Sequence, residues 1–318
     1  QPHVRTDGKR VGRKDGGEFT RAQFERRIFS TLGDVEARAV KKGDLLSILD
    51  ALKADGKLRT ANVLLADLKQ MFRFAVARDI VDRNPLETVT KRDVGGADVE
   101  RDRVLSAEEL QQLSRALPDA NLSKRSEIAI WLILSTGCRI SEAMNAEWKD
   151  VDLPGRTWHL PETKNQRPHT IHLSDFAGKL LSRLLQLRVE DAKPGEATKR
   201  WVFPNSRGDG PVCIKSFGKQ LADRQRPAER RLKNRAINTE SLVLPGGRWT
   251  AHDLRRTAAT TMAQLGVSTD VIDECLNHII ASRVSRVYIR DRRLKEQAHA
   301  FDLLGKRLSG LVSDPLKI

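Results

Sequence analysis

The chain has 318 residues, of which 39% are hydrophobic and 31% are charged, so it is long enough for two folded domains. Its formal net charge of +15 points to a polyanionic partner, of which nucleic acid is the commonest. No stretch approaches the roughly 18 apolar residues of a membrane span, and no apolar signal core opens the chain. These features exclude a membrane protein and favour a protein that binds nucleic acid; a basic surface without a ligand is the alternative.

The distribution of cysteine and of charge narrows the class further. Cys138, Cys213 and Cys275 are widely spaced and form no CxxC pair. This argues against a disulfide framework and against a zinc site, and it fits a reducing cytoplasm. The first 100 residues hold 20 basic and 16 acidic side chains, or +4, whereas the rest hold 37 and 26, or +11. The excess positive charge therefore lies mainly in the second part of the chain.

Residues 1–93 divide into a polar start and a small helical domain. Residues 1–18 are polar and rich in glycine and basic side chains, as in an arm or linker. Over residues 19–93 three apolar stripes with spacings of three and four predict helices, the last from Thr60 to Ile80. Asn84-Pro85 ends this pattern. Residues 94–103, which contain Gly95-Gly96, have the composition of a linker.

A second domain is predicted to begin at residue 104, because Ser106 and Glu109 form a capping-box pattern that starts a helix. The apolar run Ile128–Leu134 predicts a helix buried in the domain centre. Alternating residues at 157–160 and 169–173 predict a β-hairpin, with a short edge element at 201–204. Residues 224–248 form a basic stretch without an apolar period, and are predicted to be a loop with short helical pieces.

Two further helices close the chain. Thr250 is placed to cap a helix that ends near Gly266. An amphipathic helix is predicted in the C-terminal segment 293–318, although Gly305 weakens its continuity. Its apolar stripe consists of Leu294, Ala298, Phe301, Leu304, Leu308 and Leu311. Together these elements predict a mainly α fold with a small β-sheet, an α+β architecture.

Four short segments carry groups suited to attack on a phosphodiester. Each has an ordinary structural explanation by itself, such as a capping arginine, a solvated lysine or a packed tyrosine. Their joint order within one basic domain is what carries the argument. The segments are Thr136-Gly137-Cys138-Arg139-Ile140-Ser141-Glu142, Thr163-Lys164-Asn165, His252-Asp253-Leu254-Arg255-Arg256-Thr257, and Leu276-Asn277-His278 followed by Tyr288, the only tyrosine.

This joint pattern resembles the tyrosine recombinase (phage integrase) family over about residues 20–290. The His-x-x-Arg box at 252–255 is the most specific single match, and the segments around Asn277 and around 78–85 look most like prophage or genomic-island integrases. The chain departs from the family in two ways. Asn277 stands where the family usually has glycine, and His278 lies ten residues before Tyr288, where many members have nine.

The resemblance implies a role for each matched residue. Bidentate guanidinium groups stabilise charge on non-bridging phosphate oxygens, which suits Arg139 and Arg255. Tyr288 is the implied nucleophile, giving a 3′-phosphotyrosyl link and a free 5′-hydroxyl. His252 is the implied base and Lys164 the general acid. His278 is expected to hydrogen-bond the phosphate and Glu142 to orient its neighbours. No metal or other cofactor is expected, because the covalent link conserves the bond energy.

The resemblance also implies an architecture and an activity. A helical SAM-like core-binding domain (19–93) and an integrase-type catalytic domain (104–292) would clamp double-stranded DNA. The expected protein is a cytoplasmic site-specific DNA recombinase, monomeric or weakly oligomeric alone. It would form a homotetramer on two DNA sites through a Holliday junction, with accessory DNA-bending proteins as possible partners. The alternatives are a type IB topoisomerase, which the helical domain disfavours, and a catalytically silent DNA-binding protein, which the complete residue set disfavours.

Two expectations concern the ends of the chain. Gln1 is not an initiator methionine, and a basic tract follows at residues 9–14. By resemblance, an arm-binding domain is expected to precede this sequence in the natural protein. The apolar stripe of the C-terminal helix is expected to dock on a neighbouring protomer; packing within its own domain is the alternative.

Overall fold

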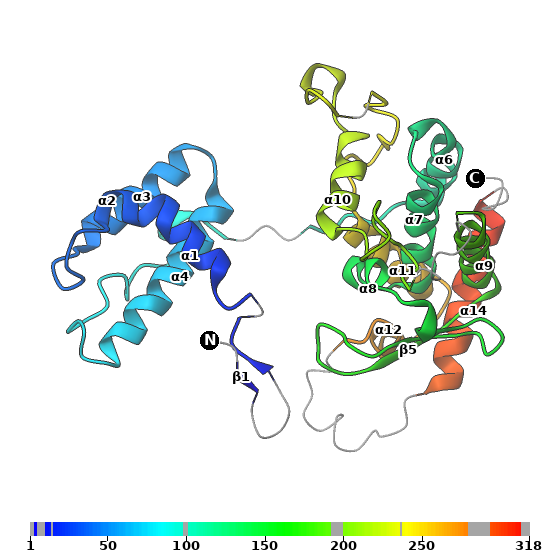
Figure 1. Cartoon of the computed structure of the whole chain (residues 1–318), viewed down its shortest axis with the longest axis horizontal. Coiled ribbons are helices and arrows are strands. Elements are labelled where there is room, and N and C mark those ends of the chain that lie inside the picture. Colours follow the sequence, from blue (N-terminus) through cyan, green and yellow to red (C-terminus); the bar gives the residue numbers. More distant parts are fainter. Residues whose placement is uncertain are drawn as a thin grey trace. The chain divides into compact units, whose positions relative to one another are not determined.

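The computed structural model describes residues 3–4, 10–13, 15–97, 101–191, 200–235, 237–278 and 293–312. The chain divides into two compact units, residues 1–101 and 102–318 (Figure 1). Helices dominate both units, and the second also contains a small three-stranded sheet. The predicted class, mainly α with a small β-sheet, is therefore confirmed. None of the helices among the described residues is long and apolar enough to cross a membrane.

The first unit is a small helical domain preceded by a short ribbon. Its core contains Leu49, Leu68 and Leu86, all fully buried. The helix predicted over 60–80 ends at Val76, because Asp79 takes a left-handed φ of +55° and its amide closes the last turn onto the Val76 carbonyl. The elements are strands β1 (His3–Val4) and β2 (Arg10–Val11), and helices α1 (Glu18–Phe24), η1 (Glu25–Phe29), α2 (Ser30–Leu32), α3 (Lys42–Ala54), α4 (Leu58–Val76) and α5 (Lys91–Val94).

The second unit is built around one central helix, α7. Every residue from Ile128 to Leu134 is at most 2% exposed, which confirms the prediction of a buried helix. Neighbouring helices α9, α11 and α14 pack against it. The helices are α6 (Ala107–Ala116), η2 (Pro118–Ala120), α7 (Lys124–Thr136), α8 (Ile140–Met144), η3 (Trp148–Asp150), α9 (Asp175–Glu190), α10 (Ile214–Asp223), η4 (Ala228–Arg230), α11 (Ala251–Gln264), α12 (Thr269–Cys275) and α14 (Leu294–Leu311).

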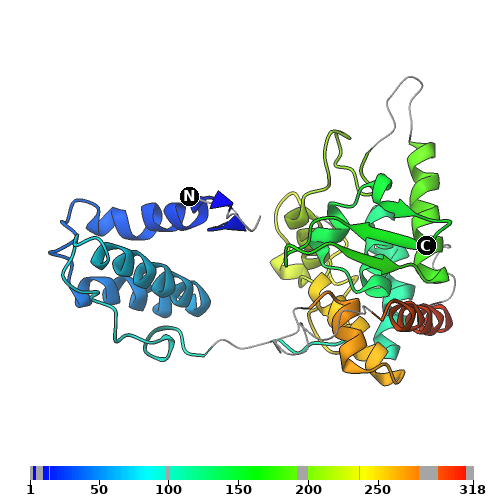
Figure 2. The ribbon, with the colours of Figure 1, turned by 90° about the horizontal axis from the view of Figure 1, so that it is seen from below.

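The sheet lies at one end of these helices (Figures 1 and 2). Strands β3 (Val151–Asp152), β4 (Thr157–Leu160) and β5 (His169–His172) pair in that order, all antiparallel. The predicted hairpin is β4–β5, and its register puts Trp158 opposite Ile171, both buried. Residues 201–204 contribute two isolated bridges instead of a strand, Glu147 to Trp201 and Pro204 to Pro211.

Both predicted helix starts are confirmed by their capping contacts. The Ser106 hydroxyl accepts from the Glu109 amide at 3.2 Å, and the Glu109 carboxylate accepts from the Ser106 amide at 3.0 Å. At the start of α11 the carboxylate of Asp253 accepts from the Thr250 amide at 2.9 Å and from its hydroxyl at 2.8 Å. The contacts made by amides satisfy donors that the start of a helix leaves without a partner.

The C-terminal helix α14 packs within its own unit. Phe301, Leu304 and Leu308 are fully buried in the core of the second unit. The expectation that this stripe docks on a neighbouring protomer is therefore wrong for these three residues, and the intramolecular alternative holds. Gly305 does not interrupt the helix. A Cβ there would lie 2.4 Å from the Ser174 hydroxyl oxygen, so a larger side chain does not fit. Glycine at this position allows α14 to approach the start of α9 closely.

Candidate active site

Arg139 lies at the N-terminal cap of α8, directly after the chain leaves the central helix. Gly137 ends α7 with a left-handed φ of +59°, and a Cβ there would lie 2.7 Å from Leu276 Cδ2. Glycine is thus needed both for the turn and for the close approach. Glu142 accepts from the Arg139 amide at 2.7 Å and from its Nη1 at 2.9 Å. The carboxylate therefore fixes both the backbone and the side chain of Arg139.

Arg255 lies on α11 and is 5% exposed. Its Nη1 donates to the Gly137 carbonyl at 2.6 Å, and its Nη2 donates to the Leu276 carbonyl at 2.5 Å. Burial, together with the nearby positive charge of Arg139, lowers the pKa of Arg255 to about 10. The group is still charged at neutral pH, so the site keeps a buried cation whose fork is oriented by two backbone carbonyls.

His252 lies one turn before Arg255 on the same helix. Partial burial and the positive charges of Arg256, Arg255 and Arg139 lower the pKa of His252 below its usual 6.5. His252 is thus close enough to Arg139 and Arg255 for their charges to affect its pKa. At neutral pH the uncharged imidazole therefore predominates, and one of its ring nitrogens is able to accept a proton.

Lys164 lies in the exposed connection between β4 and β5, and its two neighbours tie this connection to the turn before His278. Asn165 Nδ2 donates to the Asn277 carbonyl at 2.5 Å, and Asn277 Nδ2 donates to the Thr163 hydroxyl at 3.1 Å. Asn277 has a left-handed φ of +50°. This conformation explains why glycine suits the position, and why asparagine, which tolerates it best among other residues, is accepted here.

His278 follows that turn, and Asp273 orients it. The His278 amide donates to the Asp273 carbonyl at 2.8 Å, and its Nδ1 lies 2.8 Å from Asp273 Oδ1. The imidazole is about half exposed. Tyr288 lies outside the described residues.

One series of contacts thus joins the four sequence segments of the site. The Arg255 guanidinium donates to two backbone carbonyls. One is that of Gly137, two residues before Arg139, and the other is that of Leu276, two residues before His278. The next residue, Asn277, is bonded to both neighbours of Lys164. The structure therefore brings together six of the seven residues singled out from the sequence: Arg139, Glu142, Lys164, His252, Arg255 and His278.

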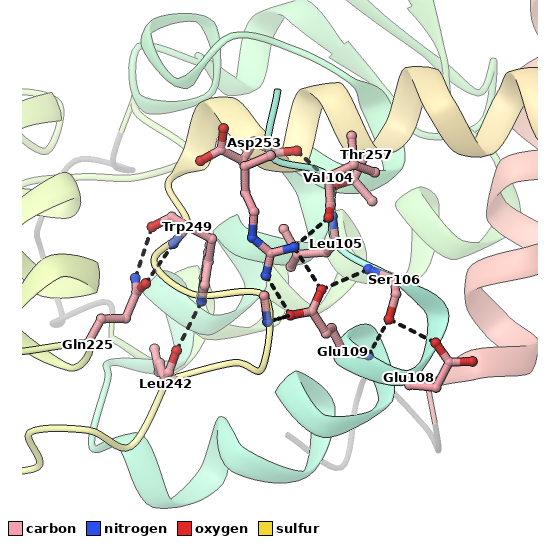
Figure 3. A network of polar contacts seen from close by, with 12 residues as sticks. Val104, Leu105, Ser106, Glu108, Glu109, Gln225, Leu242, Trp249, Asp253 and Thr257 are labelled. Carbon is pink, nitrogen blue, oxygen red and sulfur yellow. Dashed lines mark hydrogen bonds and ion pairs between the residues drawn. The ribbon is translucent and has the colours of Figure 1, made fainter. Parts of the chain in front are cut away.

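A second network supports the helix that carries His252 and Arg255 (Figure 3). The Leu105 amide donates to the Thr257 hydroxyl at 3.0 Å, and that hydroxyl donates to the Asp253 carbonyl at 2.8 Å. Glu109 also binds the Gly246 amide at 2.7 Å and the Arg103 guanidinium at 2.5 and 2.8 Å. The segment before α6 is thereby fixed to α11, and the first turn of α6 is fixed to the loop that precedes α11.

Hydrogen bonding overcomes the cost of burying the Glu109 carboxylate. Burial raises the pKa of this group, but donors from Arg103, Ser106 and Gly246 lower it to about 2. Glu109 was predicted from sequence only as a capping residue. Glu109 also contacts Arg103 and Gly246, which lie outside its own helical turn. Thr257, Asn165 and Asn277 likewise bond to residues far away in the sequence. Helix periodicity does not predict contacts of this kind.

No group of three or more histidine, cysteine, aspartate or glutamate side chains that could hold a metal ion occurs among the described residues.

Comparison with known proteins identifies the class. Residues 103–294 match the phage integrase family, and residues 10–92 match the phage integrase central domain. The first match alone covers more than half of the chain. This protein therefore belongs to the phage integrase family.

Individual relatives agree with this membership. Prophage integrase IntA of Escherichia coli is 25% identical over 276 residues, which cover 86% of this chain and 60% of the relative. Tyrosine recombinase XerD of Mycobacterium leprae is 30% identical over 247 residues, covering 76% of this chain and 71% of the relative. The chain thus spans about three-fifths of the length of IntA.

Solved structures share the fold. A lambda integrase fragment, crystallised as a dimer bound to a COC′ core site, has a TM-score of 0.64 at 17% identity, with 89% of this chain and 90% of that chain covered. The Tn1549 transposon integrase in complex with circular intermediate DNA has a TM-score of 0.61 at 22% identity, with coverages of 91% and 94%. At these identities the likeness establishes the fold alone.

Proposed function

We propose that this protein is a site-specific DNA recombinase that cleaves and rejoins duplex DNA through a covalent 3′-phosphotyrosyl intermediate. The observation that carries the proposal is the series of contacts in which Arg255 joins the Arg139 segment to the His278 segment, and Asn277 joins the latter to the Lys164 loop. Membership of the phage integrase family and the net charge of +15 support it.

In the proposed reaction the two arginines hold the scissile phosphate. Attack on phosphorus builds negative charge on the non-bridging oxygens, and guanidinium forks stabilise it by paired hydrogen bonds. The Arg255 fork is already oriented by two carbonyls, and Arg139 is held by Glu142, so little reorganisation accompanies the reaction. Glu142 acts as a positioning residue for Arg139. His278, oriented by Asp273, contributes a further hydrogen bond to the phosphate.

Proton transfers accompany the exchange of oxygen atoms at phosphorus. The Tyr288 hydroxyl attacks the phosphate and loses its proton, which the uncharged His252 accepts. The bond from phosphorus to the 5′-oxygen breaks, and Lys164 protonates that leaving oxygen. The 3′-phosphate stays linked to Tyr288 until a 5′-hydroxyl of the same or another strand reverses the step. No metal ion takes part in this scheme.

The proposed partner is double-stranded DNA, which the helical domain (19–93) and the catalytic domain (104–292) both bind. Exchange between two sites requires four protomers and passes through a Holliday junction; the lambda integrase that shares this fold has been crystallised as a tetramer on such a junction. We place the reaction in the cytoplasm, with DNA-bending proteins as possible accessory factors.

A nicked suicide duplex tests the chemistry directly. Cleavage near the nick releases a short 5′-hydroxyl fragment by diffusion, so the covalent protein–DNA adduct accumulates. The adduct should form with chelator present and should carry a 3′-phosphate. Tyr288→Phe, which removes one oxygen, should abolish it while duplex affinity stays unchanged. An adduct in Tyr288→Phe, or one that requires a divalent metal, would refute the proposal.

A type IB topoisomerase is the alternative that shares this chemistry. The two functions differ in their products from supercoiled plasmid. A recombinase joins ends between two cognate sites, whereas a topoisomerase relaxes a plasmid that lacks such sites. Relaxation of site-free plasmid without any exchange between cognate sites would favour the topoisomerase.

A further inference from the structure

A long basic loop, residues 225–241, separates α10 from the helix that carries His252 and Arg255. Its ends meet, because the Leu242 amide donates to the Arg224 carbonyl at 3.0 Å. Connections longer than about 12–15 residues without regular structure are uncommon in compact domains and usually carry a function. Apart from the single turn η4, no helix or strand occurs among the described residues of this loop.

The base of the loop is fixed firmly to the second unit. The buried guanidinium of Arg224 donates to the carbonyls of Ala120 and Asn121 at 2.9 and 2.6 Å. The Gln225 side chain accepts from the Trp249 amide at 2.8 Å and donates to its carbonyl at 3.0 Å (Figure 3). The indole of Trp249 donates to the Leu242 carbonyl at 3.0 Å. The tip of the loop therefore projects from a rigid stem that continues directly into α11.

The loop tip concentrates positive charge. Five basic residues and one acidic residue, Glu229, lie between positions 226 and 235. Arg226 and Arg235 each lie 3.6 Å from the carboxylate of Asp223. Arg230, Arg231 and Lys233 are exposed and have no ion pair with an acidic side chain in the described part of the chain. Three uncompensated cations thus stand together on a structured loop.

The backbone of the tip is folded into successive turns that hold these cations in place. The Arg230 amide donates to the Pro227 carbonyl at 2.9 Å, and the Arg231 amide donates to that of Ala228 at 3.1 Å. A further turn closes from the Arg235 amide to the Leu232 carbonyl at 3.1 Å. A loop with defined turns loses less conformational entropy on binding a ligand than an unstructured tail does.

The charge selects the kind of partner. The three cations of the tip need an anionic ligand, and another copy of this chain, with a net charge of +15, offers them little complementary charge. A polyphosphate backbone instead offers evenly spaced negative charges to several cations at once. The stem is continuous in sequence with Thr250, the cap of the helix that carries His252 and Arg255, so the loop and the proposed active site belong to the same unit.

We propose that the basic loop binds backbone phosphates of duplex DNA through Arg230, Arg231 and Lys233. This inference rests on the proposed function, since it takes the substrate of the active site as its ligand. The contacts carry no sequence information, because phosphates are the same at every base pair. The loop thus adds affinity for the duplex without adding specificity for the site.

The test measures duplex affinity as a function of salt for a loop variant and a matched control. The loop variant replaces Arg230, Arg231 and Lys233 by glutamine. The control replaces Lys179, Lys295 and Lys306, three exposed cations of α9 and α14, in the same way. Each lost phosphate contact lowers the slope of log affinity against log salt by about 0.9, so the loop variant should lose roughly 2 to 3 from the wild-type slope. The control should keep that slope.

A second variant tests the opposite change in the charge of the loop. Glu229→Gln removes the only acidic side chain between 226 and 235, and should strengthen binding at low salt. Losses in the loop variant should be equal on cognate and scrambled duplexes. Equal salt slopes for the loop variant and the wild type would overturn the inference, even if the wild type forms the tyrosyl adduct normally. A wild type that forms no adduct would instead refute the proposed function, whatever the loop does.

Discussion

The Nη1 atom of Arg255 lies 2.6 Å from the carbonyl oxygen of Gly137, although the two residues are 118 positions apart. Gly137 is the left-handed residue that turns the chain out of α7, two positions before Arg139. One arginine of the site therefore holds the backbone that presents the other. Its second fork nitrogen holds the Leu276 carbonyl in the same way, two positions before His278.

Replacement of Arg255 by lysine should therefore damage the site even though the charge is kept. A lysine ammonium is a point charge without the planar fork that reaches two carbonyls together. Adduct formation on the suicide duplex should slow by about 10²–10³-fold, the usual cost of losing one preorganised donor in a reaction of this kind. The rate is measured in single-turnover assays at saturating protein.

The matched control for this change is Arg183→Lys on α9. Arg183 also donates through its guanidinium, but to the carboxylate of Glu190 at the surface, 2.8 Å away. Surface ion pairs contribute about 0–1 kcal/mol, so the control should cleave at the wild-type rate. Equal losses in both variants would show that the orienting contacts of Arg255 are unimportant.

His252 sets a pH dependence with a defined sign. Burial and three neighbouring arginines lower its pKa below 6.5, so the base is already deprotonated at pH 7. Cleavage at sub-saturating protein, which reports on the free enzyme, should fall on the acid side with a midpoint below pH 6.5. His252→Gln should be slower throughout and should lack this acidic limb. A limb centred above pH 6.5 in the wild type would contradict the assignment.

Lys164 should act on the leaving group. If it protonates the departing 5′-oxygen, Lys164→Ala should slow cleavage by roughly 10²–10⁴-fold. A substrate with sulfur at that bridging position leaves more easily without a proton, so it should be cleaved at nearly the wild-type rate. Equal losses on the oxygen and the sulfur substrates would assign Lys164 to binding instead.

Asn277 allows backbone strain to be separated from a side-chain contact. Its φ of +50° is open to glycine but costs other residues roughly 1–2 kcal/mol. Asn277→Gly should therefore be more stable than Asn277→Ala by about that amount in urea unfolding. Both variants lose the hydrogen bond to Thr163, so both should show the same slower cleavage. If the less stable variant instead cleaves more slowly than the other, the hydrogen bond to Thr163 does not position the Lys164 loop.

The sequence predicts the local parts of this molecule well, because those parts depend on neighbouring residues. The capping boxes at Ser106 and Thr250 involve side chains three positions apart, and the burial of α7 follows from its uninterrupted apolar run. The predicted end of the helix at Ile80 is wrong, because α4 ends at Val76. Hydrophobic spacing does not reveal the left-handed conformation of Asp79 that follows.

The assembly of the site was predictable only by resemblance. The contact from Arg255 to Gly137 depends on tertiary packing, and no period or spacing in the chain announces it. The same holds for the tail: an apolar stripe fits a neighbour or its own domain equally well. Only the contact of Gly305 with the start of α9 explains why a glycine interrupts that stripe without ending the helix.

The Glu109 carboxylate should make the second unit sensitive to acid. Donors from Arg103, Ser106 and Gly246 lower its pKa from 4.5 to about 2 although burial opposes this. A depressed carboxylate pKa contributes stability that is complete above pH 4.5 and is lost as the pH falls towards 2. The shift corresponds to roughly 3 kcal/mol, an order-of-magnitude value. Glu109→Gln should lack this pH-dependent contribution and should be less stable than the wild type at pH 7.

Tryptophan fluorescence suits this measurement, because all five tryptophans lie beyond residue 102 and so report on the second unit. Urea unfolding at pH 7, 4.5 and 3 gives the free energy of unfolding for each protein. The difference between wild type and Glu109→Gln should shrink as the pH falls. Glu162→Gln, in the exposed connection between β4 and β5, removes a carboxylate outside the buried network and should leave the wild-type pH profile almost unchanged. A constant difference between wild type and Glu109→Gln at all three pH values would mean that the buried charge itself does not stabilise the start of the second unit.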